Sequence, residues 1–200
     1  MKIEASEELA YWVGVVQSDG CLNIYHDKKR NKIFYRISVD VGKKSFPMLK
    51  KFQNISNLIL GCSIEIYKCK NDVFKCTLGA KRLLDNLKLL DIKISDSPIP
   101  PNWICDNENF IGNYLAGIID GDGNVSIRKD QKKCVIEIFS HEKQILLQSL
   151  IKNRLKCGAW IRKASGNCYG IGFIISHKNY KFVKNCILPN VAIAHKKEAL

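Results

Sequence analysis

The sequence lacks any apolar run long enough to cross a membrane, because charged residues interrupt each hydrophobic stretch within about ten residues. It also lacks an N-terminal basic region followed by an apolar segment and a small-residue cleavage site, which excludes a visible secretory signal. We therefore expect an intracellular protein, in the cytoplasm or in an organelle matrix, with no membrane partner.

Acidic residues are scarce relative to basic ones, with 19 Asp and Glu against 32 Lys and Arg and a net charge of +13. An excess of this size is typical of a protein that binds a polyanion. With 46% apolar residues in 200, the chain can still bury one ordinary core or two small halves that share one. The composition predicts a folded protein whose partner is nucleic acid.

Close-spaced metal ligands of the zinc type are also missing. The nine cysteines are scattered and odd in number, no CxxC occurs, and the four histidines form no cluster. This argues against a zinc site and against a secreted disulfide framework. We expect reduced thiols, most of them small core residues.

What the chain does contain is an internal duplication. Ser6 is a good N-cap for a helix over residues 7–18, which Asp19-Gly20 ends. In the first half the spacing of apolar residues then predicts a hairpin, a helix, a second hairpin and a third helix, over 21–41, 45–60, 63–78 and 80–90.

The second half repeats this order. A helix over 110–121 ends at Asp122-Gly123, and the elements after it are a hairpin, a helix, a hairpin and a last helix, over 124–140, 142–155, 159–176 and 177–188. Asp19 and Asp122 are 103 residues apart, whereas Val39 and Val41 precede their expected equivalents, Ile136 and Ile138, by 97. A longer tip in the first hairpin accounts for the difference.

The expected fold is α+β: a pseudo-twofold duplication of αββαββα, with two antiparallel sheets and helices packed behind them. We predict an N-terminal half over 1–94, a linker over 95–109 and a C-terminal half over 110–200. Pro98, Pro100 and Pro101 are expected to keep regular structure out of the linker.

The two copies share small residues on one helix face. Gly14 lies four residues before Ser18, and Gly117 four before Gly121. Small residues at this spacing let two helix backbones approach closely, and a mid-helix glycine costs about 1 kcal/mol relative to alanine unless such a contact compensates. We predict that the two helices pack along these four residues, as the contact between the halves.

Such packing would bring Asp19 and Asp122 side by side at the helix ends. Two unpaired carboxylates at that distance repel one another and raise each other's pKa, and a divalent cation removes the conflict. Mg²⁺ prefers one or two carboxylates together with water and substrate phosphate. A lone Asp-Gly after a helix is usually only a cap and turn, but two copies at the same station favour a metal site.

At these residues the sequence resembles the LAGLIDADG homing endonucleases, in their single-chain form with two motifs. LAGIIDGDG (115–123) differs from the name-giving pattern at two positions, and WVGVVQSDG (12–20) departs further, with Gln17 where an acid is common. The aspartate before the last glycine is the metal-binding acid of the family, and both Asp19 and Asp122 match it. The resemblance covers nearly the whole chain.

The resemblance implies an Mg²⁺-dependent endonuclease that cuts both strands of a long double-stranded DNA site and leaves short 3′ overhangs. Two or more divalent ions would activate water and stabilise the leaving oxygen, and Ca²⁺ could support binding without cleavage. Ser18 and Gly121 would join Asp19 and Asp122 in the metal site. The family places a lysine near each site, shortly after the last helix of each half. Lys93 and either Lys196 or Lys197 match, and the resemblance implies that they act in catalysis with Asp19 and Asp122 by polarising the water network. The protein would act as a monomer without a small-molecule cofactor.

The family lays the exposed faces of its sheets in the major groove of DNA. With Leu22, Ile24, Val125 and Ile127 expected on the core side, alternation sends polar residues to the other face, where they can contact base edges. These are Asn23, Tyr25, Arg36, Ser38, Asp40, Asn124, Ser126 and Glu137, together with Arg128. The phosphate contacts that we expect are Lys28, Lys29, Arg30, Lys129, Lys132, Lys133, Arg162 and Lys163.

Two other interpretations remain open at the level of sequence. The same fold can bind nucleic acid without cutting, as an intron RNA maturase or a transcriptional regulator. Alternatively, the Asp-Gly pairs merely end helices in an inert duplicated domain. Retention of both acids in a groove that binds a polyanion favours the nuclease, because a pure binding protein has little use for two facing carboxylates.

Overall fold

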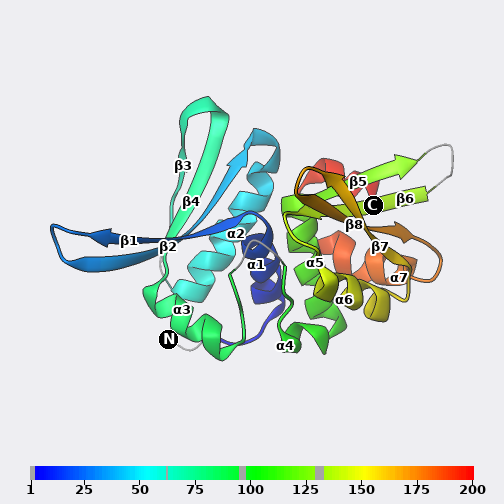
Figure 1. Cartoon of the computed structure of the whole chain (residues 1–200), viewed down its shortest axis with the longest axis horizontal. Helices are drawn as coiled ribbons and strands as arrows, with labels where there is room; N and C mark the ends of the chain where they lie inside the picture. The colour runs from blue at the N-terminus through cyan, green and yellow to red at the C-terminus, as the bar shows by residue number, and fades with distance from the viewer. Residues whose placement is uncertain (1–2, 62, 95–97, 129–132) are drawn as a thin grey trace.

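The computed structural model describes residues 3–61, 63–94, 98–128 and 133–200 and has the expected α+β architecture. It contains two four-stranded antiparallel sheets, A and B, with strand orders β1-β2-β4-β3 and β5-β6-β8-β7. The shared order confirms that the second half repeats the first. Figure 1 shows helices α1 and α5 between the two sheets.

The first half begins with α1 (Glu7–Ser18), whose N-cap Ser6 accepts a hydrogen bond from the backbone amide of Leu9 at 3.1 Å, as predicted. The other elements are β1 (Gly20–Asp27), β2 (Lys32–Gly42), η1 (Lys43–Ser45), α2 (Phe46–Leu60), β3 (Ile66–Lys68), η2 (Lys70–Asp72), β4 (Val73–Gly79) and α3 (Lys81–Leu89). Helix α2 ends at Gly61, whose φ of 60° is left-handed.

The second half carries α5 where the first carries α1. Its elements, preceded by a short helix α4 (Asn102–Cys105), are α5 (Glu108–Asp122), β5 (Gly123–Arg128), β6 (Lys133–Ser140), α6 (Ile145–Leu155), β7 (Ala159–Ser165), β8 (Cys168–Ile175), α7 (Tyr180–Phe182), η3 (Val183–Ile187), η4 (Leu188–Asn190) and α8 (Ala194–Ala199). The core lies between the sheets and the helices behind them, and α1 and α5 contribute about a third of its buried residues.

Two details of the chain path differ from the sequence prediction. The linker holds one turn of helix, α4, because Pro101 precedes the first helical residue, where its missing amide costs nothing. The expected last helix is divided among α7, the π-helical η3 and the 3₁₀ turn η4, and the unpredicted α8 follows it. The limits proposed for the two halves stay a prediction, since part of the linker, 95–97, lies outside the described residues.

The register of the strands changes the alignment of the two halves. Gly20 pairs with Val39 and Gly123 pairs with Ile138, so the residue equivalent to Val39 is Ile138, two positions beyond Ile136. The prediction that paired Val39 with Ile136 was therefore wrong. Apolar residues alternate along both strands, and periodicity alone cannot detect a shift of two residues.

Alternation predicted the faces of the sheets correctly near α1 and α5 but not at the hairpin tips. Ile37, Val39 and Val41 are buried, and Leu22 and Val125 pack against the core. Ile24 and Ile127, expected in the core, are 59% and 56% exposed. The outer ends of β1 and β5 extend beyond the helices that cover the sheets, so their core side faces solvent (Figure 1).

Candidate metal and nucleic-acid site

Helices α1 and α5 cross in backbone contact at Gly14 and Gly117. A Cβ built on Gly14 would overlap the carbonyl oxygen of Tyr114 and lie 3.1 Å from the Cα of Gly117. A Cβ built on Gly117 would overlap the carbonyl oxygen of Tyr11 in the same way. No residue other than glycine fits at either position without moving one of the helices.

The second pair of small residues lies in contact at the ends of the same helices. A Cβ built on Gly121 would overlap the hydroxyl of Ser18 and lie 3.4 Å from Oδ2 of Asp19. The Ser18 hydroxyl donates to the carbonyl oxygens of Gly14 and Val15, at 2.9 and 3.2 Å. The carboxylate of one half therefore reaches the backbone of the other half, one residue before Asp122.

Both carboxyl groups at the helix ends are partly buried and carry raised pKa values. Burial, together with the negative charge of Asp19, raises the pKa of Asp122 to about 7, and Lys196 opposes both effects. Burial also raises the pKa of Asp19, again against the charge of Lys196. Two acids in this state repel one another when ionised, and they gain from a cation placed between them.

Lys196 on α8 lies beside these acids. Its ammonium group donates to the carbonyl oxygens of Ile119, Asp120 and Gly121, at 2.7, 2.7 and 3.2 Å. It thereby caps the negative end of α5. Burial lowers its pKa, and the charges of Asp120, Asp19 and Asp122 partly restore it.

The other two lysine candidates differ from Lys196. Lys197 is exposed, and so is Lys93. The backbone of Lys93 is nevertheless tied to the end of α1, because its carbonyl oxygen accepts a hydrogen bond from the Gln17 amide at 2.7 Å. The two halves thus present unequal lysines to the site.

Four buried residues that the sequence analysis did not assign to the site join the halves just behind it. The hydroxyl of Tyr11 donates to Asp120 at 2.7 Å, and the hydroxyl of Tyr114 donates to Gln17 at 2.8 Å. Tyr11 and Tyr114 are 103 residues apart, as Asp19 and Asp122 are, and this shared separation is the sequence signal that could have found them. Each helix is thereby hydrogen-bonded to its symmetry equivalent.

Gln17 and Asp120 also fix the segments that follow each half. The carboxylate of Asp120 accepts from the backbone amides of Ala192 and Ile193, at 2.7 and 3.1 Å. The Gln17 side chain donates to the carbonyl of Ile99 and accepts from its amide, at 3.0 and 3.1 Å. The neutral amide of Gln17 therefore has the same structural role as the acid of Asp120, since each holds the segment that follows its half.

Without substrate, the oxygen ligands that the protein offers fill only part of the coordination shell of Mg²⁺. Asp19 and Asp122 offer two carboxylates, and within the described residues no group of three or more His, Cys, Asp or Glu side chains is placed to hold a metal ion. Mg²⁺ commonly takes one or two carboxylates and completes its shell with water and substrate phosphate. The Gly121 carbonyl accepts a hydrogen bond from Lys196, and the Ser18 hydroxyl bonds to its own helix. Of the four predicted metal-site residues, the two aspartates therefore offer the oxygens best placed to bind a cation, and the roles of Ser18 and Gly121 stay a prediction.

The outward face of sheet A carries the predicted polar residues. Asn23 pairs with Arg36, whose guanidinium lies 4.9 Å from the centre of the Tyr25 ring. Asp40 forms an ion pair of 2.9 Å with Lys75 on β4. Ser38, at 4% exposure, is the least accessible of this set.

The outward face of sheet B is occupied differently. Asn124 and Arg128 are exposed and Ser126 is half-buried. Glu137 is 8% exposed and accepts from Arg162 at 2.8 Å. Glu137, predicted to contact a base, and Arg162, predicted to contact a phosphate, are thus paired with one another in the free protein.

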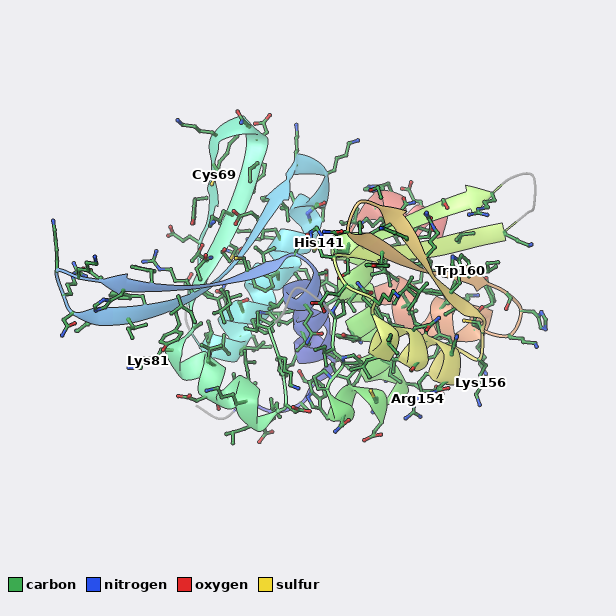
Figure 2. The ribbon with its side chains drawn as sticks, in the orientation of Figure 1. Cys69, Lys81, His141, Arg154, Lys156 and Trp160 are labelled. Atoms are coloured by element: carbon green, nitrogen blue, oxygen red, sulfur yellow. The ribbon has the colours of Figure 1, made fainter. Side chains whose placement is uncertain are left out.

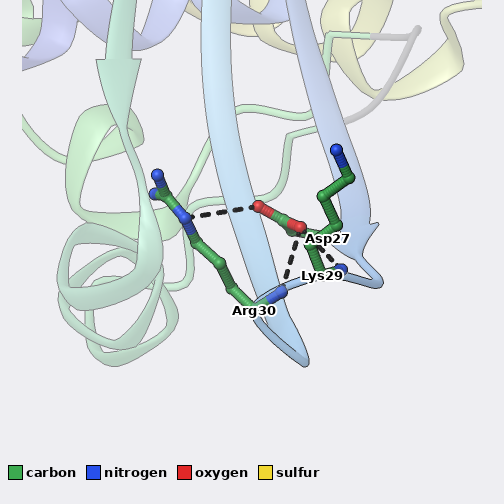
Figure 3. Close-up of polar contacts among 3 residues, drawn as sticks. All are labelled: Asp27, Lys29 and Arg30. Carbon is green, nitrogen blue, oxygen red and sulfur yellow. Dashed lines mark hydrogen bonds and ion pairs between the residues drawn. The ribbon is translucent and has the colours of Figure 1, made fainter.

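The tip of the first hairpin is ordered by Asp27 (Figure 3). Its carboxylate accepts from the backbone amides of Lys29 and Arg30, at 3.0 and 3.2 Å, and lies 3.8 Å from Nε of Arg30. Lys28, Lys29 and Arg30 are exposed at this tip. In the second half Lys133 and Lys163 are exposed, and Lys129 and Lys132 lie outside the described residues.

Comparison with known proteins agrees with this geometry. Residues 115–198 match the sequence model of a family described as "LAGLIDADG endonuclease". Among solved structures, mesophilic variants of the homing endonuclease I-DmoI align with 90% of this chain and 90% of their own, at 17% identity and a TM-score of 0.66. The I-SmaMI LAGLIDADG homing endonuclease bound to cleaved DNA aligns with 99% of this chain and 87% of its own, at 14% identity and a TM-score of 0.59. The LAGLIDADG meganuclease I-AabMI bound to uncleaved DNA aligns with 98% of this chain and 88% of its own, at 10% identity and a TM-score of 0.63.

The chain thus has the fold of these LAGLIDADG proteins over nearly its whole length, and residues 115–198 match the sequence model of the family. The resemblance seen in the residues 115–123 is confirmed. Within the described ranges, no helix is both long and apolar enough to span a membrane.

Proposed function

We propose that this protein is a site-specific homing endonuclease that makes a double-strand break with short 3′ overhangs in a long DNA target. The observation that supports this most is the meeting of two half-buried carboxylates, one from each half, at the glycine-lined crossing of α1 and α5. A protein that only binds DNA gains nothing from two such acids facing a polyanion. Because one chain supplies both acids, we propose that it acts as a monomer.

Asp19 and Asp122 would bind divalent ions, which supply Lewis acidity and activate water for attack on phosphorus. Structures of I-DmoI variants with their target DNA were determined in the presence of Mg and of Mn, which supports a role for divalent ions here. Crossed packing of α1 and α5 fixes the separation of the two carboxylates, so that each can serve one DNA strand. Lys196 would hold its positive charge beside the scissile phosphates, and Lys93 would serve the other strand less directly.

The experiment is a cleavage assay on duplex DNA spanning the insertion site of the gene that encodes this protein, with Mg²⁺ and with Ca²⁺. We expect double-strand cleavage in Mg²⁺, and binding without cleavage in Ca²⁺. Asp19→Asn and Asp122→Asn should each remove double-strand cleavage and retain binding. Asp91→Asn is the matched control, because Asp91 is exposed and asparagine tolerates its positive φ of 53°.

Tight binding with intact DNA in both ions would contradict the nuclease and support the alternative, a non-cleaving maturase or regulator on the same fold. Unchanged cleavage by both asparagine variants would show that the paired acids do not act in the reaction.

A further inference from the structure

The two sheets present chemically different surfaces, although their strands follow the same order. On the outward face of the two middle strands of sheet A, register places Arg36, Ser38 and Asp40 on β2, and Lys75, Thr77 and Gly79 on β4. Aligned on the glycine after each motif aspartate, the equivalents in sheet B are Val135, Glu137 and Phe139 on β6, and Gly170, Gly172 and Ile174 on β8. The first set is polar except for Gly79, whereas Glu137 is the one charged residue of the second.

Two aromatic rings cover the glycines of β8. A Cβ built on Gly172 would overlap the indole of Trp160, with the indole Nε1 2.6 Å away. A Cβ built on Gly170 would lie 3.1 and 3.3 Å from two ring carbons of Phe139. Both rings therefore lie against the outward face of sheet B, and both stay partly exposed (Figure 2 labels Trp160).

The one charged group among these residues is already neutralised. Both Nε and an Nη of Arg162 bond Oε1 of Glu137 at 2.8 Å, and the guanidinium lies 5.9 Å from the centre of the Phe139 ring. This leaves Trp160, Phe139 and Ile174 as an accessible apolar surface on a protein of net charge +13. We call these three residues the sheet B apolar surface.

We propose that the sheet B apolar surface recognises thymine methyl groups in one half of the DNA target, with Trp160 as the specificity-determining residue. This rests on the proposed function, which puts the outward face of each sheet in the major groove. The C5-methyl of thymine is the apolar group that base edges present in that groove, and apolar side chains select it there. Sheet A, with its polar set, would read its half of the target by hydrogen bonds instead.

The test begins with selection of bound sequences from a randomised duplex library in Ca²⁺, with the wild type, with Trp160→Ala and with Tyr67→Ala. Tyr67 on β3 is the matched control, because it is a partly exposed aromatic residue on the outer strand of sheet A. We expect thymine preferences confined to one half of the selected site, and their loss with Trp160→Ala but not with Tyr67→Ala.

Deoxyuridine, which lacks only the methyl group, is then placed at those thymine positions. For the wild type we expect binding to weaken about fourfold per methyl removed, the value of one buried methylene. Trp160→Ala should bind the thymine and uracil duplexes equally, and Trp160→Phe should retain part of the difference. Melting curves of the variants identify any loss of folding, and the wild-type comparison of thymine with uracil decides the matter without them.

Wild-type protein that binds a selected site with equal affinity for thymine and uracil would overturn this inference and leave the nuclease intact. Thymine preferences that survive Trp160→Ala in a folded variant would also overturn it. Failure of the wild type to bind any duplex would overturn the proposed function and the inference together.

Discussion

At the scale of single residues, the halves are joined by two hydrogen bonds that look equivalent and differ in charge. Tyr11 donates to the carboxyl group of Asp120, and Tyr114 donates to the neutral amide of Gln17. A hydrogen bond to a charged acceptor contributes more to stability, and its loss leaves a buried charge short of a donor. Removing the hydroxyl of Tyr11 and that of Tyr114 should therefore have different effects on stability.

We expect Tyr11→Phe to lower the free energy of unfolding by about 1.5–3 kcal/mol, and Tyr114→Phe by about 0.5–1.5 kcal/mol. The measurement is urea denaturation of both variants and the wild type at pH 8. Equal losses would mean that Asp120 is uncharged in the folded protein or that its two backbone donors suffice.

The acid at the end of α5 makes stability depend on pH. The pKa of Asp122 is raised to about 7, against about 3.9 in an unfolded chain, so the folded protein binds this proton more tightly. Stability from this group is therefore fully present below pH 4, is lost as pH rises toward 7, and is constant above that. Without a bound metal ion, the ionised Asp122 therefore destabilises the folded protein.

Asp122→Asn should accordingly be more stable than the wild type at pH 8 without divalent ions, by about 1–2 kcal/mol after allowance for solvent screening. The difference should vanish near pH 4. Denaturation in EDTA across this pH range measures it, and added Mg²⁺ should stabilise the wild type more than the variant. A variant less stable than the wild type at pH 8 would contradict the prediction.

At the scale of elements, the crossing of α1 and α5 depends on glycines in contact with backbone atoms. Alanine at either position would overlap a carbonyl oxygen of the partner helix, and backbone cannot move aside as a flexible side chain can. The two helices would have to separate, which would displace Asp19 from Asp122.

Gly14→Ala and Gly117→Ala should each lower the free energy of unfolding by about 2–3 kcal/mol, although alanine is the better helix former by about 1 kcal/mol. Gly158→Ala is the control, because no atom lies within 4 Å of its built Cβ and its φ is not positive, and it should change stability by less than about 0.5 kcal/mol. Chemical denaturation of the three variants tests this. A stabilised Gly14→Ala would show that the helices are less closely packed.

The same elements show what sequence can and cannot predict. The duplication, the N-cap at Ser6 and the order of helices and strands follow from local patterns, and each appears in the structure. The approach of Asp19 to Gly121 could be predicted, because the small residues of one helix face recur 103 residues later on the other helix. Helix α8 was missed because its short sequence has no apolar periodicity, and its contacts with β5 and the end of α5 exist only after folding.

At the scale of the whole molecule, exposed lysines lie both on the predicted DNA surface and on the helical layers. Lys28 and Lys29 stand at the tip of the first hairpin, which Asp27 holds in a defined turn. Lys88 on α3 and Lys152 on α6 are also exposed, but they lie on helices behind the sheets (Figure 1). Both pairs contribute the same +2 to the net charge, so they separate phosphate contact from general attraction.

If the tip binds phosphates, the Lys28→Ala/Lys29→Ala double variant should weaken binding to every duplex and reduce the slope of log K against log salt by about 1.8, which is about 0.9 for each phosphate that a lysine no longer neutralises. The Lys88→Ala/Lys152→Ala double variant should leave the slope nearly unchanged, because long-range attraction is screened beyond about 8 Å at physiological salt. Fluorescence anisotropy with a labelled duplex in Ca²⁺, across a salt series, measures both slopes. Equal reductions would assign the salt dependence to net charge alone, and the hairpin tip would then have no special role in holding DNA.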